Sequence, residues 1–452
     1  MNPEFRRLTA ADFQGHRLAA LAVVLAGAFG AAYLADDWSI GATTGFFAVV
    51  GFFALVFVWG TRQAAESVIQ EINLRTWDAQ RMSSLPAWSL AWSKLTGATA
   101  FTWLGGFVCL AFYGAAHIEP WGIHQTLVRV FLYAASGFFA QAVCFLIGLA
   151  AIQRRRQFGR VQVVSYQFLG LLVALPPLYI GLSVTGGESI LDLIIWYGRY
   201  VTLAEFMTVA VGAFSLWALV GAWALMRAEL QEPIGPWVWA GFTLFAMAFF
   251  AGVRNFPVGP SLRLAMIEMP DLPTLAFGVG LFAAYSILYT EPKDRLRLFG
   301  MVGDLRAGRW QGAARLFPRS LIALALALLG GIFATLADGG HTAQQVPALL
   351  AQFVAMTLFA LRDFGLTYWI CLGRTDGRGE GLAAAILVLA YIPVPMALGL
   401  GGVGPLLSVF TPVPGAPPWL MMALPGIEAA GLIWLLRRRW RRLAGALAER
   451  DP

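Results

Sequence analysis

Two lysines limit the nucleotide chemistry that this chain can do by itself. Of its 32 basic residues, only Lys94 and Lys293 are lysines. A phosphate-binding loop needs a Gly-Lys-Ser/Thr run, because the lysine ammonium must reach the outer phosphates while glycine amides surround them. Lys94 follows Ser93 and Lys293 follows Pro292, so neither belongs to such a loop. We therefore expect no cofactor in this chain, and any ATP and Mg²⁺ to be bound by a partner.

Ionisable residues within apolar stretches are the second group that could do chemistry. Glu428 lies near the middle of such a stretch, Glu205 and Arg129 lie nearer to outer ends, and Arg362 and Asp363 lie at an inner end. A charge at mid-membrane is expensive, so Glu428 needs a polar partner or a proton. We expect Glu428 to face the interior of a helix bundle, either as a structural hydrogen-bonding group or as part of a proton or substrate site.

The cysteines and histidines do not indicate metal chemistry. The three cysteines are Cys109, Cys144 and Cys371, and the four histidines are spread from residue 16 to residue 341. None has the short spacing of a metal-ligand set. We therefore expect no metal site.

Composition places these residues in a membrane. Apolar residues make up 59% of the 452 residues and charged residues 13%, with a mean hydropathy of +0.68. A soluble domain carries roughly 25% charged residues. The chain is therefore predicted to be an all-α polytopic membrane protein. Arginines that flank apolar spans set membrane orientation, so the isoelectric point near 9.6 predicts no nucleic-acid partner.

Twelve stretches are apolar enough to cross a hydrocarbon core of about 30 Å, which needs roughly 20 residues per helix. They lie near 18–35, 41–60, 96–116, 127–152, 164–184, 201–226, 237–252, 274–290, 320–337, 346–361, 381–403 and 418–436. With the N-terminus inside, 28 of the 32 basic residues fall at cytoplasmic ends, as the positive-inside rule requires. We therefore predict both termini in the cytoplasm, and an integral protein of a bacterial inner membrane.

The predicted spans form two sets of six, at 1–230 and 231–452, on either side of a polar stretch with two prolines. A long cytoplasmic loop joins the second and third spans of each half, at 61–95 and at 291–319. These matched loops favour a parallel repeat of two six-helix halves.

The fifth spans of the two halves share a further feature. Pro176 and Pro177 in the first, and Pro393 and Pro395 in the second, each precede a Gly-Leu pair. Prolines there should kink a membrane helix. The similarity is short, and common use of helix breakers could also produce it.

The first cytoplasmic loop is charged, amphipathic and free of glycine over 62–95. Its spacing predicts a helix over 62–82, with Val68, Ile72 and Trp77 on one face. Pro86 fits the first turn of a second helix. The same pattern also fits an interfacial hairpin that merely joins two spans.

This segment resembles the cytoplasmic coupling helix of permease subunits of ATP-binding-cassette (ABC) exporters of the second type. In that pattern an acidic residue precedes Gly-Thr-x-Asp/Glu; a Leu-rich stretch, a Ser/Thr-x-x-Pro-like element and Gly-Lys follow before the third span. The matching residues are Glu71, Thr76, Trp77, Asp78, Met82, Ser84, Pro86, Trp88 and Lys94. Arg75 and Ser93 replace the two glycines. The six-span half extends the resemblance over 1–226, and the second half resembles the family by architecture only.

The resemblance implies an export permease driven by a separately encoded ABC-type ATPase. Charged contacts to that partner would come from Glu71, Asp78, Arg81 and Lys94, and the apolar anchor from Trp77, Met82 and Trp88. A second ATPase copy would contact Arg295, Arg297, Arg306, Arg309 and Trp310. The family also has a short re-entrant element before its sixth span, and 189–205 fits either this element or an ordinary interfacial helix. The transported substrate is not indicated by the spans.

Two other functions compete with this interpretation. A proton-coupled secondary transporter would use Glu428, and residues 303–309 loosely resemble the Asp-Arg-x-Gly-Arg loop of major-facilitator proteins with one residue inserted. A membrane-embedded lipid or glycan transferase would need clustered acids or histidines at one membrane face. The sequence has no such cluster, so we expect no catalytic residues.

Overall fold

The structure is a computed structural model in which two compact units are defined. It describes residues 3–83, 85–152, 163–168, 170–172, 193–232, 234–257, 266–268, 271–291, 293, 295–337, 342, 345–373, 379–400 and 417–448. Unit 1 comprises Met1–Ile234 with Asn255–Glu268, and unit 2 comprises Gly235–Arg254 with Met269–Pro452. The main boundary at Ile234 lies close to the one predicted at residue 230.

Long apolar helices make this a predominantly helical polytopic membrane protein. Eight helices in the described part are long and apolar enough to cross a membrane. One of them, α6 (Ala87–Ile152), has 66 residues and would extend about 100 Å if straight, three times a hydrocarbon core. It bends at Gly122, where φ is 76° and ψ is 159°, so its two arms coincide with the spans expected at 96–116 and 127–152. The count of twelve spans stays a prediction.

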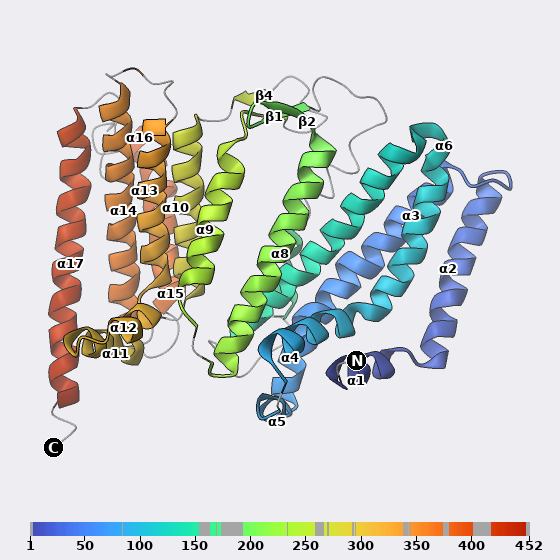
Figure 1. The fold of residues 1–452 in the computed structure, drawn as a ribbon, viewed down its shortest axis with the longest axis horizontal. Coiled ribbons are helices and arrows are strands. Elements are labelled where there is room, and N and C mark those ends of the chain that lie inside the picture. The colour runs from blue at the N-terminus through green and yellow to red at the C-terminus, as the bar shows by residue number, and fades with distance from the viewer. Residues whose placement is uncertain are drawn as a thin grey trace. The chain divides into compact units, whose positions relative to one another are not determined.

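Unit 1 consists of long helices with short elements at their ends (Figure 1). Before α6 come α1 (Pro3–Asp12), α2 (Gly15–Ala35), α3 (Ala42–Phe52), the π-helix η1 (Phe53–Gly60), α4 (Thr61–Asn73) and α5 (Trp77–Arg81), and after it comes α8 (Leu203–Glu229). Residues 163–168 and 170–172 are also helical. The proline pair Pro176 and Pro177 lies outside the described residues.

The prediction of one continuous helix over 62–82 was wrong. The helix ends with α4 at Asn73, and α5 is a separate short helix. Between them, Arg75 has a left-handed conformation with φ of 60°. The hydrophobic residues keep a helix-like spacing across this turn, because the spacing follows which side chains are buried. Periodicity alone could therefore not reveal the turn.

The interfacial helix considered for 189–205 was also not found. In the described part, β1 (Leu193–Trp196) pairs antiparallel with β2 (Arg199–Thr202), and α8 follows directly. The turn residues Tyr197 and Gly198 both have positive φ, as a tight hairpin requires. A second small hairpin pairs β3 (Asn255–Pro257) with β4 (Met266–Glu268). The fold is therefore almost entirely, but not strictly, α-helical.

Unit 2 also consists of long helices, with two short helices at one end. Its helices are α9 (Trp237–Ala251), α10 (Leu272–Thr290), α11 (Arg295–Arg306), α12 (Trp310–Leu316), α13 (Arg319–Ala337), α14 (Gln345–Gly373), α15 (Gly379–Tyr391), α16 (Pro393–Leu400) and α17 (Pro418–Ala448). α14 continues to Gly373, beyond the predicted end of the tenth span at residue 361, and the membrane boundary itself stays a prediction. The helix is divided into α15 and α16 at Pro393, the position where a kink was expected.

Helices pair in a similar order within each unit, except that in unit 2 α9 also packs on α13. In unit 1, α2 packs on α3, α3 and α4 pack on α6, and α6 packs on α8. In unit 2, α9 packs on α10, α10 on α13, and α14 on α17. Each unit thus has a first pair, a central contact across the long loop, and a closing pair.

Small residues let the helices of each core approach closely, as is usual in membranes. In unit 1, a Cβ atom at Gly106 or Gly137 would lie only 2.5 or 2.6 Å from the methyl groups of the fully buried Val56. In unit 2, Phe277 stacks on Phe353 with ring centroids 4.5 Å apart. These contacts give each unit a rigid centre from which the polar groups are positioned.

Candidate functional site

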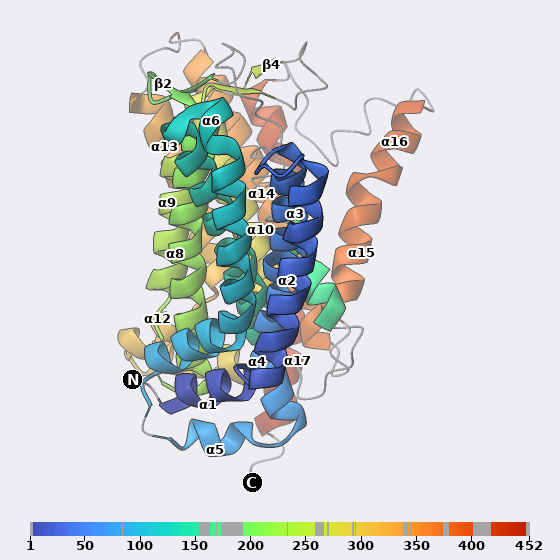
Figure 2. The ribbon, with the colours of Figure 1, turned by 90° about the vertical axis from the view of Figure 1, so that its right-hand side faces the viewer.

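The segment that resembles a coupling helix lies at one end of unit 1. In both Figure 1 and Figure 2, α1, α4 and α5 lie at this end, and β2 lies at the other. α4 continues the long helix that starts at Ala42, and α6 starts one residue after Pro86. The segment therefore joins two long helices of the unit through two short connections and α5.

A buried ionic network holds this end together. The Lys94 side chain is 0% exposed, and its Nζ lies 2.6 Å from Glu4 Oε1 and 2.8 Å from Glu71 Oε1. Arg7 Nη2 lies 2.8 Å from Glu4 Oε1 and also donates to Glu71 Oε1. Two cations and two carboxylates thus tie α1, α4 and α6 together. Sequence reasoning singled out Glu71 and Lys94 but missed Glu4 and Arg7.

The ionic network shifts the pKa values of the two charged groups that α1 contributes, Glu4 and Arg7. Burial alone would raise the pKa of Glu4, but hydrogen bonds from Arg7 and Lys94 outweigh it and lower that pKa below its ordinary value of 4.5. Hydrogen bonds to Glu4 and Glu71 raise the pKa of Arg7. Both groups are therefore ionised at neutral pH, and α1 is attached by charge as well as by packing.

The turn at Arg75 has the hydrogen bonds of a Schellman motif. The Thr76 amide donates to Glu71 O at 2.9 Å, and the Arg75 amide donates to Ile72 O at 3.0 Å. Arg75 occupies the left-handed position of the motif, which usually holds glycine, and it is also where the family pattern has glycine. The Thr76 hydroxyl donates to Glu71 Oε2, so the turn and the ionic network share one carboxylate.

The remaining residues of the pattern divide into buried and exposed ones. Trp77 is 2% exposed, and together with Glu71 and Lys94 it is engaged inside unit 1. These three side chains are not presented to a partner, contrary to the contact role expected for them. Met82 and the Asp78 side chain are each 82% exposed. Also on the surface are Thr76, Pro86 and Trp88, whereas the Arg81 side chain is partly covered and Ser84 lies outside the described residues.

The second loop has a matching connection. The Glu291 carboxylate is buried at the start of the loop, accepts hydrogen bonds from the backbone amides of Arg319 and Ser320 at 2.7 and 3.3 Å, and accepts one from the Tyr368 hydroxyl at 2.5 Å. An anion at a helix N-terminus is favourable, so Glu291 fixes the start of α13. Each loop thus contains a buried carboxylate that binds the N-terminal part of the next long helix, Glu71 near the end of α4 and Glu291 directly after α10.

Three of the basic residues predicted in this second loop, Arg295, Arg297 and Arg306, lie in α11, and Arg309 immediately precedes α12. Among the described residues of α11, no side chain is fully buried. Trp310 is exposed, and Arg309 pairs with Asp304 at 2.7 Å. Arg297 Nε donates to Leu316 O at 3.3 Å, which holds α11 against the end of α12. Arg295 and Arg306, in the first and last turns of α11, complete the predicted set.

Glu428 has the polar partner that its position demands. Arg362 Nη1 lies 2.7 Å from Glu428 Oε2, and Arg362 Nε lies 3.0 Å from Asp363 Oδ1. The hydroxyls of Tyr285 and Tyr391 donate to Asp363 Oδ2 at 2.5 and 2.7 Å. The cluster therefore draws on α10, α14, α15 and α17. Asp363 is fully buried, so neighbouring helices cover this pair, and its position at the inner end of a span stays a prediction.

Glu205 has a local structural contact. The Thr202 amide donates to its carboxylate at 3.2 Å, and the Glu205 amide donates to the Thr202 hydroxyl at 3.3 Å. This reciprocal pair is a capping box at the start of α8. The Thr-x-x-Glu spacing could have revealed this from the sequence.

Two further buried polar groups lie in unit 1; sequence reasoning missed Gln141 and named Arg129 only by its position near an outer end. Gln141 Nε2 donates to Val56 O at 3.1 Å inside η1, a wide π-helical segment that frees backbone carbonyls. Arg129 is 2% exposed and lies 3.8 Å over the Trp121 ring. Neither group has a sequence motif, because their partners are a backbone atom and an aromatic face.

No protein-family model, curated protein or solved structure matches the chain. The two polar networks, and the exposed surface beside the first, are therefore the features that indicate a function.

Proposed function

We propose that this protein is the membrane permease of an ABC-type exporter whose ATPase is a separate protein. The observation that carries the proposal is the construction of segment 71–94. Glu71 and Lys94 lock it to the long helices through buried ion pairs, while Asp78, Met82 and Trp88 remain available on its surface. A rigid element with an exposed apolar and acidic face is what a motor subunit needs to move membrane helices.

The left-handed turn at Arg75 gives further support. It sets the direction of α5 relative to α4, and it falls where the family pattern has glycine. Thr76, the next residue of the pattern, donates to the same carboxylate that binds Lys94. One hydrogen-bonded turn thus contains Glu71, Arg75 and Thr76, which the sequence alone could only align with the family pattern.

A parallel repeat of two six-helix halves, with twelve spans and cytoplasmic termini, forms part of the proposal. It is supported by the similar order of helix pairing in the units and by the loop carboxylates Glu71 and Glu291. In this arrangement the second loop contacts another ATPase copy through α11 and α12. The inner membrane of a bacterium fits the arginine distribution, and the partner binds all ATP and Mg²⁺.

Site-specific photo-crosslinking in cells tests the docking surface. A crosslinking amino acid at Met82 or Trp88 should capture an ATPase that contains a phosphate-binding loop, identified by mass spectrometry. The same amino acid at Tyr200, which is also exposed but lies in β2 at the other end of unit 1, should not. Asp78→Arg should reduce the crosslink from Met82. Crosslinks from Tyr200 alone, or none to an ATPase, would refute the permease proposal.

A proton-coupled secondary transporter is the second candidate, and the Arg362–Asp363–Glu428 cluster favours it. One cation faces two carboxylates there, a composition found in intramembrane proton relays. Proteoliposomes that contain the chain alone and a trapped pH-sensitive dye test this function. Proton flux that is lost in Glu428→Gln would support it, whereas absence of flux in the parent protein would favour the permease.

A further inference from the structure

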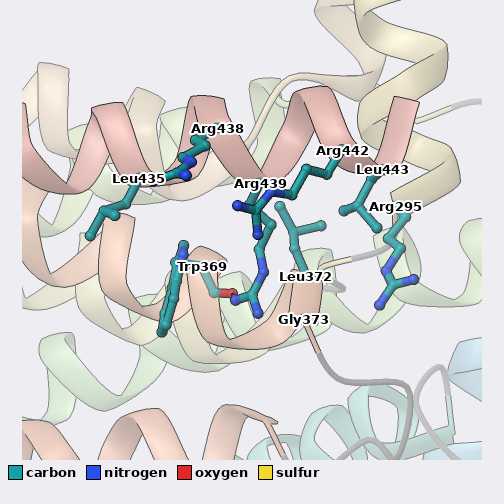
Figure 3. A pocket seen from close by; sticks show the side chains of 9 residues that line it. All are labelled: Arg295, Trp369, Leu372, Gly373, Leu435, Arg438, Arg439, Arg442 and Leu443. Atoms are coloured by element: carbon teal, nitrogen blue, oxygen red, sulfur yellow. Dashed lines mark hydrogen bonds between the residues drawn. The ribbon is translucent and has the colours of Figure 1, made fainter. Parts of the chain in front are cut away.

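An open cavity of about 370 Å³ lies in unit 2, where α14 ends and α17 leaves its apolar stretch. Four arginines line it: Arg295 from α11, and Arg438, Arg439 and Arg442 from α17 (Figure 3). Apolar side chains of α14 and α17 complete its wall. A cavity with both linings at the end of membrane helices suits a ligand that is itself amphipathic.

One of the four arginines is already committed. Arg439 donates to the backbone oxygen of Trp369 and lies 4.3 Å over the Trp369 ring. A Cβ atom at Gly373 would lie 2.4 Å from the Arg439 guanidinium carbon, so glycine is needed for this approach. Arg439 thus satisfies a carbonyl in the last turn of α14, where a cation is favoured.

The other three arginines have no acidic partner among the described residues, although the Arg438 guanidinium lies 5.6 Å over the exposed Trp434 ring. Within the described parts of the chain, no carboxylate forms an ion pair with Arg295, Arg438 or Arg442. Arg438 and Arg442 are one helical turn apart, so they share a face of α17. Three guanidinium groups with no acidic partner there would attract an anion, and the planar donors of arginine match phosphate oxygens.

The level of the cavity identifies the anion. Leu435 belongs to the last turn of the apolar stretch predicted at 418–436, and Arg442 follows about 10 Å further along the helix. The cavity therefore spans the boundary between hydrocarbon and headgroups. Leu372, Leu435 and Trp369 would contact the glycerol and the first acyl carbons, which free phosphate lacks.

We propose that this cavity binds the headgroup of an anionic phospholipid, with Arg438 and Arg442 on the phosphodiester. Basic pockets between membrane helices are suited to such headgroups. The site is distinct from segment 71–94 and does not depend on the permease function. The bound headgroup holds α11, α14 and α17 together at the end of unit 2.

Native mass spectrometry of the purified full-length protein tests the proposal, with phosphatidylglycerol and phosphatidylcholine added to the detergent micelles. The parent protein should retain phosphatidylglycerol in preference to phosphatidylcholine. Arg438→Gln/Arg442→Gln should weaken phosphatidylglycerol binding by about tenfold or more. Arg437→Gln/Arg441→Gln removes the same charge from α17 outside the cavity lining, and should change binding by less than about twofold.

Three results would overturn the proposal. Equal losses in the two double variants would show general attraction to a basic helix. Displacement of phosphatidylglycerol by inorganic phosphate at the same concentration would assign the cavity to a free anion. Protection of Arg438 and Arg442 from chemical labelling by an ATPase, but not by phosphatidylglycerol, would assign it to a protein partner. A retained gel-filtration profile confirms that each variant is folded.

Discussion

The two units bury ionic networks that differ in position and in charge balance. In unit 1, Lys94 and Arg7 face Glu4 and Glu71 where long helices meet short ones. In unit 2, Arg362 faces Asp363 and Glu428 well inside α14 and α17. The first network pairs each carboxylate with two cations, and the second offers two carboxylates a single cation.

This difference indicates different tasks. A balanced network with short contacts resists distortion, so the unit 1 network suits a fixed joint between α1, α4 and α6. In unit 2 the missing positive charge is offset by the hydroxyls of Tyr285 and Tyr391, which donate to Asp363. A hydroxyl can rotate to another hydrogen-bond partner, whereas the paired cations of unit 1 have no substitute for their charge. The unit 2 network is therefore the one whose hydrogen-bonding state can change.

The largest effect is expected from Arg362→Met. Two carboxylates would then lose the only cation that contacts them within the described residues. Breaking a buried ion pair by removing one partner costs about 3–5 kcal/mol, and here two pairs are lost at once. We expect a loss of thermal stability in detergent large enough to impair expression. Adding Glu428→Gln to this variant should restore part of the lost stability. If stability were not restored, the Arg362–Glu428 pair would make no net contribution.

Lys94→Met should cost less, about 3 kcal/mol, because Arg7 still contacts both Glu4 and Glu71. The exposed pair of Arg62 with Glu66 provides the control, since Arg62→Met should cost less than about 1 kcal/mol. Thermal unfolding of the purified variants measures both. If Lys94→Met were more damaging than Arg362→Met, the comparison of the two networks would be reversed.

The sequence predicted which residues matter better than it predicted their partners. Glu71, Lys94 and Glu428 were identified by motif or by position. Their contacts were not predictable, because Glu4 and Arg7 lie more than sixty residues from Glu71 and carry no pattern. Helical pattern follows burial, so it gave the long helices. It could not show the left-handed turn at Arg75 or the hairpin at 193–202, where local backbone preference decides.

The end of α14 shows the same limit in unit 2. Arg362 and Asp363 looked like the polar end of a span, so the predicted span stopped at residue 361. The structure continues the helix because Tyr285, Tyr391 and Glu428 from other helices satisfy both charges. A polar pair ends a membrane helix only when no other helix supplies its partners, which sequence does not reveal.

A smaller effect is expected at the turn that shapes the unit 1 network. A non-glycine residue in the left-handed region costs about 1 kcal/mol, so Arg75→Gly should raise the free energy of unfolding by up to that amount. Leu74→Gly is the control, because Leu74 has φ of −81° and gains nothing from glycine. It should lower stability. Equal effects of the two substitutions would show that the turn is not strained.

The smallest effect is a pH dependence confined to α1. Because the pKa of Glu4 lies below 4.5 in the folded protein, its contribution to stability is complete above that pH and is lost as the pH falls through the lowered value. A spin label attached through Arg6→Cys, on the exposed face of α1, should therefore gain mobility only below pH 4.5. In the Glu4→Gln background, the label should be more mobile at neutral pH and lose most of this transition. An unchanged transition in that background would show that another group, and not Glu4, releases the helix.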